Sequence, residues 1–190
     1  MPPFDSLIGV LASRSFSTIW FWLALIGMWS AAGRTVLGVP VEVLARARTA
    51  LRRDAPDGPE AITLMDWLSL TLPRWRLGPR EGVVFLGVTS FGLTSLAVLG
   101  FGFGLELAQA LTLVAVPFWL LFWLRVRLAR RLAPILSDAQ EGSLPLPEAV
   151  SGAVRHMVRH RILHMALSVA AVLVTLLWGM LWMLIRPFGF

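Results

Sequence analysis

Long apolar stretches alternate with polar, arginine-rich segments along the whole chain. Four of the apolar stretches are long enough to cross a bilayer, since a transmembrane helix needs about 20 mostly apolar residues. They cover residues 15–33, 82–100, 106–124 and 162–185. The pattern therefore predicts an all-α integral membrane protein, a four-transmembrane-helix bundle in a single membrane domain that covers residues 1–190.

Two polar segments, residues 34–81 and 125–161, connect the predicted spans and carry eight and seven of the seventeen arginines. Positively charged residues are retained on the cytoplasmic side of a membrane, so we expect both segments to be cytoplasmic loops. An even number of spans then places both chain termini on the periplasmic side. The sequence thus predicts a multi-pass protein with its basic parts in the cytoplasm.

The first of these loops contains a basic amphipathic pattern. Residues 41–53, "VEVLARARTALRR", place Val41, Leu44 and Leu51 on one side of a helix and arginines on the other. This pattern is typical of a helix that lies on the inner leaflet or docks an acidic soluble partner. The next apolar stretch, residues 61–77, is too short for a fifth span and is expected to be interfacial or re-entrant.

The composition agrees with a membrane location, because 57% of the residues are hydrophobic and the mean hydropathy is +0.74. The net charge of +6 comes from arginines that flank apolar spans, which favours contacts with anionic lipid or a protein partner over nucleic acid. The predicted contact residues are Arg46, Arg48, Arg52, Arg53, Arg127, Arg130, Arg131, Arg155, Arg159 and Arg161. The absence of cysteine excludes disulfides, cysteine-ligated iron–sulfur clusters and cysteine nucleophiles.

Glu106 begins the third predicted span, and Gln109 lies one helical turn further along. A carboxylate is favoured at the start of a helix by the helix dipole, so we expect a capping or interfacial role. The alternative is a proton or cation site in a small transporter or channel. The preceding "GFGFG", residues 100–104, predicts a tight hairpin between the second and third spans.

The three histidines, His156, His160 and His164, are spaced by four and share one helical face. They extend over about 12 Å, so two could bind one metal ion but three could not. Neighbouring arginines repel a dication. We expect a basic collar at the membrane surface, without metal or cofactor; the alternative is a haem- or metal-bearing redox subunit.

Two further patterns concern the ends and the packing of the spans. Trp178 and Trp182 lie near the outer end of the fourth predicted span, where tryptophans are typical of membrane interface belts. Small residues four apart, such as Gly27 and Ala31, allow helix backbones to approach one another. Such pairs favour compact packing and are compatible with a homo-oligomer.

Three stretches of the chain also resemble one group of proteins: "RSFSTIWFWLALIGMWS", "VLGVPVEVLARAR" and "LAVLGFGFGLELAQALTLVAVP". They are similar to small polytopic bacterial inner-membrane proteins labelled as components of the SufBCD complex, which assembles iron–sulfur clusters. The similarity covers roughly residues 13–117 and includes no catalytic motif. It implies an inner-membrane location and a docking or accessory role.

No nucleophile, base and metal set characteristic of an enzyme is suggested by the sequence. We therefore expect a non-enzymatic accessory or scaffold protein of the bacterial inner membrane. Its expected partners are anionic lipid and a cytoplasmic complex, either SufBCD or another.

Overall fold

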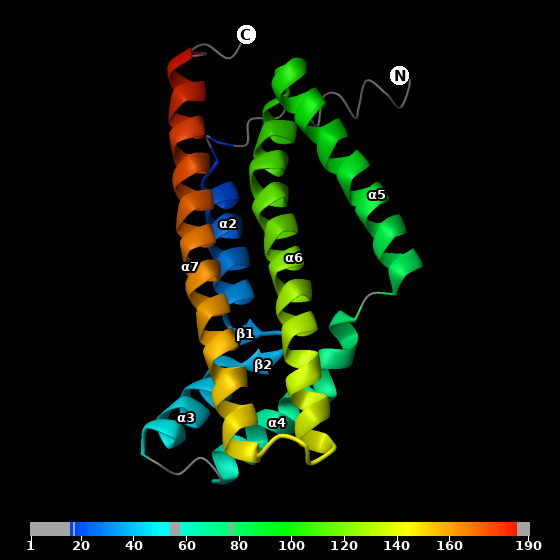
Figure 1. Cartoon of the computed structure of the whole chain (residues 1–190). Coiled ribbons are helices and arrows are strands. Elements are labelled where there is room, and N and C mark those ends of the chain that lie inside the picture. Colours follow the sequence, from blue (N-terminus) through cyan, green and yellow to red (C-terminus); the bar gives the residue numbers. More distant parts are fainter. Residues whose placement is uncertain (1–15, 17, 54–57, 77, 186–190) are drawn as a thin grey trace. The chain divides into compact units, whose positions relative to one another are not determined.

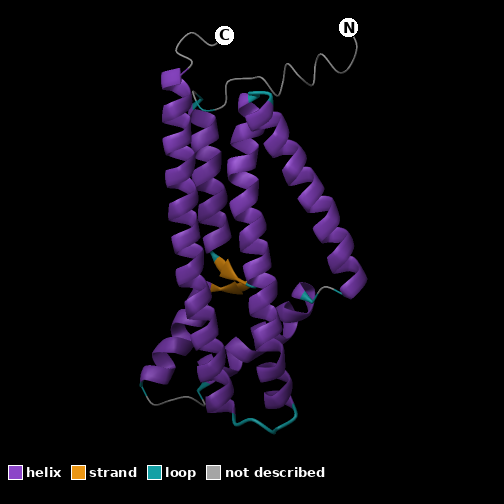
Figure 2. Ribbon diagram, turned by 45° about the horizontal axis from the view of Figure 1, so that its top comes forward, coloured by secondary structure: helices purple, strands orange, loops and turns teal. Residues whose placement is uncertain are grey.

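The computed structural model describes residues 16, 18–53, 58–76 and 78–185 (Figure 1). Its elements are α2 (Ile19–Gly33), β1 (Thr35–Val36), β2 (Val39–Pro40), α3 (Val41–Arg52), α4 (Pro59–Thr71), the 3-10 turn η1 (Leu72–Trp75), α5 (Pro79–Ala97), the π-helical turn η2 (Val98–Gly102), α6 (Glu106–Gln140) and α7 (Leu146–Ile185). Helices make up nearly all of the described chain, and the strands are only two residues long (Figure 2). The predicted all-α class is confirmed, whereas the predicted periplasmic termini lie outside the described residues.

Contacts within the chain form two compact units. Unit 1 takes its described residues from Met1–Trp29, Pro79–Leu120 and Ala166–Phe190. Unit 2 consists of the described residues of Ser30–Gly78 and Leu121–Met165. Helices α6 and α7 each contribute one part to unit 1 and the other part to unit 2.

Among the described residues, three helical segments are long and apolar enough to cross a membrane: Pro79–Gly102, Glu106–Gln140 and Leu146–Ile185. They overlap three of the predicted spans, which fits a membrane protein. The first predicted span corresponds to α2, which is apolar but has only 15 residues. A crossing by α2 therefore stays a prediction.

Unit 1 carries many of its apolar side chains on the outside. Helix α5 has no buried residue, and its Val83 and Phe91 are 71% and 76% exposed. So large an apolar exterior is unfavourable in water and suits a hydrocarbon environment. Gly27 and Ala31, predicted to pack against another helix, are also exposed within this single chain.

Helices α5 and α6 are joined by the predicted hairpin turn, in which α5 ends in the π-helical turn η2. The amide of Leu105 donates a hydrogen bond to the carbonyl of Leu99 at 3.4 Å. Gly100 lies so close to α6 that a Cβ there would be 2.7 Å from the backbone nitrogen of Gln109. Glycine is therefore required at this position by close backbone approach.

Unit 2 has a closed apolar core that the sequence did not predict. Leu44 of α3, Leu64 and Leu68 of α4, Leu132 of α6 and Met157 of α7 are all buried in one cluster. The apolar face of α3 therefore packs against protein rather than lipid. Helix α4, which falls in the segment expected to be interfacial or re-entrant, buries Leu64 and Leu68 in this core and leaves Ile62 and Leu70 exposed.

The strands β1 and β2 form a short antiparallel hairpin between α2 and α3, with Val36 paired to Val39. Leu37 and Gly38 both have positive φ, 56° and 92°, as a type I′ turn requires. Leu37 is only 1% exposed, and its carbonyl accepts a hydrogen bond from the indole nitrogen of Trp75 at 3.2 Å. The hairpin is thus held by its contacts with the unit 2 core.

Candidate functional site

Glu106, the first residue of α6, lies in a buried polar network of unit 1 and is 8% exposed. Its Oε1 accepts a hydrogen bond from the backbone nitrogen of Phe16 at 2.6 Å. Its Oε2 accepts another from the indole nitrogen of Trp182 on α7 at 3.2 Å. The carboxylate therefore connects the chain before α2 with α6 and α7.

Gln109 extends the same network and is 2% exposed. Its Nε2 donates to the carbonyl of Gly100 at 2.9 Å, and its Oε1 accepts from the indole nitrogen of Trp178 at 3.0 Å. The sequence suggested interface belts for Trp178 and Trp182, but their N–H groups donate inward to Gln109 and Glu106. Oε2 of Glu106 and Oε1 of Gln109 each accept from an indole, a donor that cannot accept.

Glu106 and Gln109 connect segments of unit 1 through their hydrogen bonds. Their hydrogen bonds to Phe16, Gly100, Trp178 and Trp182 join the chain before α2, the turn η2 and helix α7 to α6. A buried polar network of this kind rigidifies the helices that it joins.

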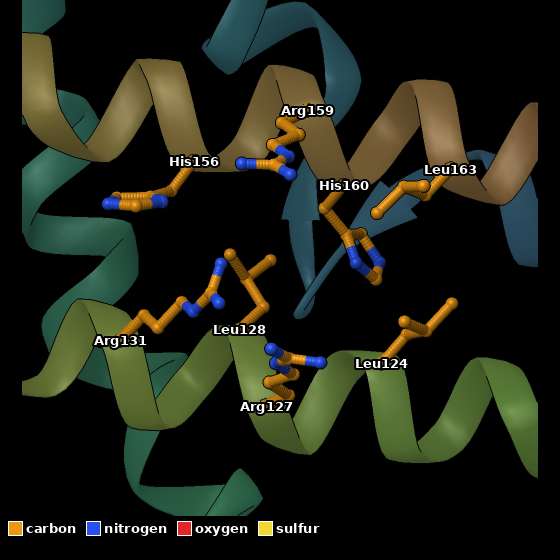
Figure 3. A pocket seen from close by; sticks show the side chains of 8 residues that line it. All are labelled: Leu124, Arg127, Leu128, Arg131, His156, Arg159, His160 and Leu163. Carbon is orange, nitrogen blue, oxygen red and sulfur yellow. The ribbon is translucent and has the colours of Figure 1, made fainter.

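A second polar cluster lines a cavity of about 120 Å³ between α6 and α7 in unit 2 (Figure 3). The lining residues are Leu124, Arg127, Leu128, Arg131, His156, Arg159, His160 and Leu163. Spacings of three and four residues on both helices bring them onto facing sides of α6 and α7. The three arginines are exposed, His156 is half-buried and His160 is buried.

His160 precedes the apolar stretch of α7 that begins at residue 162. Burial, together with the charges of Arg125 and His164, lowers the pKa of His160 from 6.5 to about 4. Its imidazole is therefore neutral at pH 7 and can both donate and accept a hydrogen bond. The positive charge of the cavity at neutral pH comes mainly from its arginines.

The three histidines do not converge on one point. His156 and His160 line the cavity, whereas the ring of His164 lies against α2, with its Cε1 3.4 Å from where a Cβ on Gly33 would be. His160 and His164 are buried, whereas Arg155, Arg159 and Arg161 beside them are exposed; the basic collar at a membrane surface stays a prediction. Across the described parts of the chain, no group of three or more His, Asp or Glu side chains could hold a metal ion.

Arg125, the first residue of the second predicted loop, has contacts that the sequence did not reveal. Its Nη2 donates to the carbonyl of Ala32 at 2.9 Å, and its guanidinium lies 5.6 Å from the centroid of the Trp75 ring. The cation satisfies a carbonyl at the C-terminal end of α2, where positive charge is favoured. A cation–π contact adds to its attachment.

All ten arginines that were predicted to contact lipid or a partner are exposed. Arg127, Arg131 and Arg159 share the cavity between α6 and α7. A second, more open groove of about 460 Å³ is lined in part by Arg48 of α3 with Arg155 and Arg159 of α7. Neither cavity is lined by the other five arginines, Arg46, Arg52, Arg53, Arg130 and Arg161.

Comparison with known proteins gives no match, since no family model fits the chain and no curated protein or solved structure is significantly similar to it. The candidate sites therefore depend on geometry and chemistry alone.

Proposed function

We propose that the chain is a non-enzymatic accessory or scaffold protein of the bacterial inner membrane, with unit 1 in the bilayer and unit 2 in the cytoplasm. The observation that supports this division is the opposite distribution of apolar side chains. Phe91 and many other apolar residues of unit 1 are exposed, whereas Leu64 and Leu132 of unit 2 lie in a closed core. An apolar exterior suits lipid, whereas an apolar core surrounded by exposed arginines suits water.

The distribution of charge supports the proposed orientation. Fourteen of the seventeen arginines belong to unit 2, and arginine is retained on the cytoplasmic side. With α2 as the fourth span, both termini are periplasmic. Unit 2 is then a folded basic domain on the cytoplasmic side.

Helix α3 is the proposed partner surface. Its apolar face is already covered by the unit 2 core, while Arg46, Arg48, Arg52 and Arg53 are exposed. A helix with an occupied apolar face cannot insert that face into lipid, so its free arginines favour an acidic protein surface or lipid headgroups. The resemblance noted above makes the SufBCD complex the first partner to test.

The transporter and redox alternatives receive less support. Glu106 and Gln109 are engaged in buried hydrogen bonds with backbone and indole groups. His164 does not line the cavity that His156 and His160 share.

The test is recovery of cytoplasmic proteins with the tagged chain, purified from native membranes in a mild maltoside detergent and identified by mass spectrometry. Arg48→Glu combined with Arg52→Glu reverses two exposed charges one turn apart on α3. We expect this pair to abolish stoichiometric recovery of a soluble complex, because it replaces attraction for an acidic surface by repulsion.

Arg74→Glu with Arg76→Glu is the matched control, since both residues are exposed in unit 2 and the change in charge is the same. Recovery should persist with the control pair. Equal recovery with both pairs, or purification of the chain alone from wild-type membranes, would contradict the scaffold role.

A further inference from the structure

The cavity between α6 and α7 concentrates positive charge in unit 2 (Figure 3). Arg127 and Arg131 of α6 and Arg159 of α7 line it together with two imidazole rings. Guanidinium groups that share a small cavity repel one another, so an anion bound among them gains attraction from each and relieves their repulsion. The planar donor fork of arginine matches the oxygens of a phosphate group.

The size of the cavity limits the ligand. At about 120 Å³ it is well below the roughly 300–1,000 Å³ typical of pockets that enclose a drug-sized molecule. It has room for a compact anionic group and for a few water molecules, which need about 30 Å³ each in the liquid. A phosphate group fits this limit, whereas an enclosed nucleotide does not.

The cavity is amphipathic along the direction of the two helices. Leu124 and Leu163 lie at one end with His160, while Arg131 and His156 lie at the other, as Figure 3 shows. Leu124 is the last residue of one predicted span, and Leu163 follows the start of another. A ligand with apolar chains at one end and a phosphate at the other would satisfy both ends, and this is the chemistry of a phospholipid.

We propose that this cavity binds the phosphate of an anionic phospholipid headgroup, with Arg127, Arg131 and Arg159 as donors to the phosphate oxygens. The inference rests on the proposed function, since it requires unit 2 to lie at a membrane surface. It adds a defined site to the general attraction of basic residues for anionic lipid. Basic pockets between membrane helices on the cytoplasmic side are the kind of site that recognises such headgroups.

The test measures stabilisation of the full chain in maltoside micelles by added ligand at constant ionic strength. A ligand that binds the folded state raises the melting temperature with a concentration dependence that reports its affinity. The probes are dihexanoyl phosphatidylglycerol, dihexanoyl phosphatidylcholine and inorganic phosphate. Each protein is compared with its own melting temperature without ligand.

The cavity variant is Arg131→Gln with Arg159→Gln, which removes one guanidinium from each helix. The control is Arg74→Gln with Arg76→Gln, two exposed arginines of unit 2 that do not line this cavity. We expect the cavity variant to require at least about tenfold more phosphatidylglycerol for half-maximal stabilisation, because charge-assisted hydrogen bonds are lost. The control should bind as the wild type does.

Three results would overturn the proposal. Equal weakening in the two variants would show a diffuse surface effect. Equal stabilisation by phosphatidylcholine would show that the anionic character is not recognised, and equal potency of inorganic phosphate would make this a site for free phosphate. None of these results bears on α3, so continued loss of partner recovery with the α3 charge reversals would leave the scaffold role in place.

Discussion

Replacing Gln109 with methionine tests whether the buried network holds unit 1 together. Methionine has a similar length and can occupy the same space, so the change removes hydrogen bonds with little change in volume. The side chain of Gln109 is 2% exposed and makes hydrogen bonds of 2.9 Å to the carbonyl of Gly100 and 3.0 Å to the indole of Trp178. Both are lost in the variant.

The magnitude follows from the two bonds and their surroundings. Side-chain hydrogen bonds between membrane helices contribute about 0.6 kcal/mol on average, and buried hydrogen bonds in general about 0.5–1.5 kcal/mol. Two such bonds give an expected loss of ~1–3 kcal/mol in the free energy of unfolding. The bond to Trp178 is isolated by Trp178→Phe, which keeps an aromatic ring in contact with Phe101 but removes the N–H donor.

The assay is unfolding by sodium dodecyl sulfate from maltoside micelles, followed by the fluorescence of the remaining tryptophans. In a double-mutant cycle of Gln109→Met and Trp178→Phe, we expect a coupling free energy of ~0.5–1.5 kcal/mol. The reasoning is refuted if Gln109→Met is as stable as the wild type, or if the two changes are additive within ~0.3 kcal/mol.

Two further changes test the hairpin turn and the buried imidazole. Gly100→Ala should lower the free energy of unfolding by about 1–3 kcal/mol, because the added Cβ would lie 2.7 Å from a backbone nitrogen. Gly102→Ala should be tolerated, because the atom nearest to its Cβ is 3.8 Å away. Equal melting temperatures of the two variants would contradict this. Because the pKa of His160 is about 4 when folded and 6.5 when unfolded, the unfolded chain binds more protons between these values. The contribution of His160 to the free energy of unfolding is therefore fully present above pH 6.5. Allowing for solvent screening, the free energy of unfolding should fall by ~1–2 kcal/mol as the pH drops toward 4. The fall should be shallower in His160→Gln. An unchanged pH slope in that variant would show that another group titrates.

The apolar helices were predictable from the sequence because the thickness of a bilayer fixes how many apolar residues a spanning helix needs. This condition identified α5, the first part of α6 and the second part of α7 without knowledge of their neighbours. The hairpin turn was also predictable, since the glycines at 100, 102 and 104 interrupt two such stretches. The position and length of each apolar helix can thus be read from its own residues.

The core of unit 2 and the polar network were not predictable in the same way. Leu44 and Leu64 have the amphipathic spacing of a surface helix, and that spacing is the same whether lipid or protein covers the apolar face. Trp178 and Trp182 occupy positions that suit a membrane interface, and only the fold shows that Gln109 and Glu106 receive their N–H groups. In each case the missing information is the identity of the facing residue, which depends on contacts distant in sequence.

The core of unit 2 has a consequence for how the protein is made. It draws on residues 36–72 and 128–157, so the apolar α5 and the beginning of α6 are synthesised between its two halves. Leu64 and Leu68 cannot be buried in the complete core until residues 128–157 have left the ribosome. A chain interrupted before residue 128 therefore carries an exposed apolar surface, which promotes aggregation and proteolysis. The core of unit 2 is therefore completed only after residues 79–120 have been synthesised.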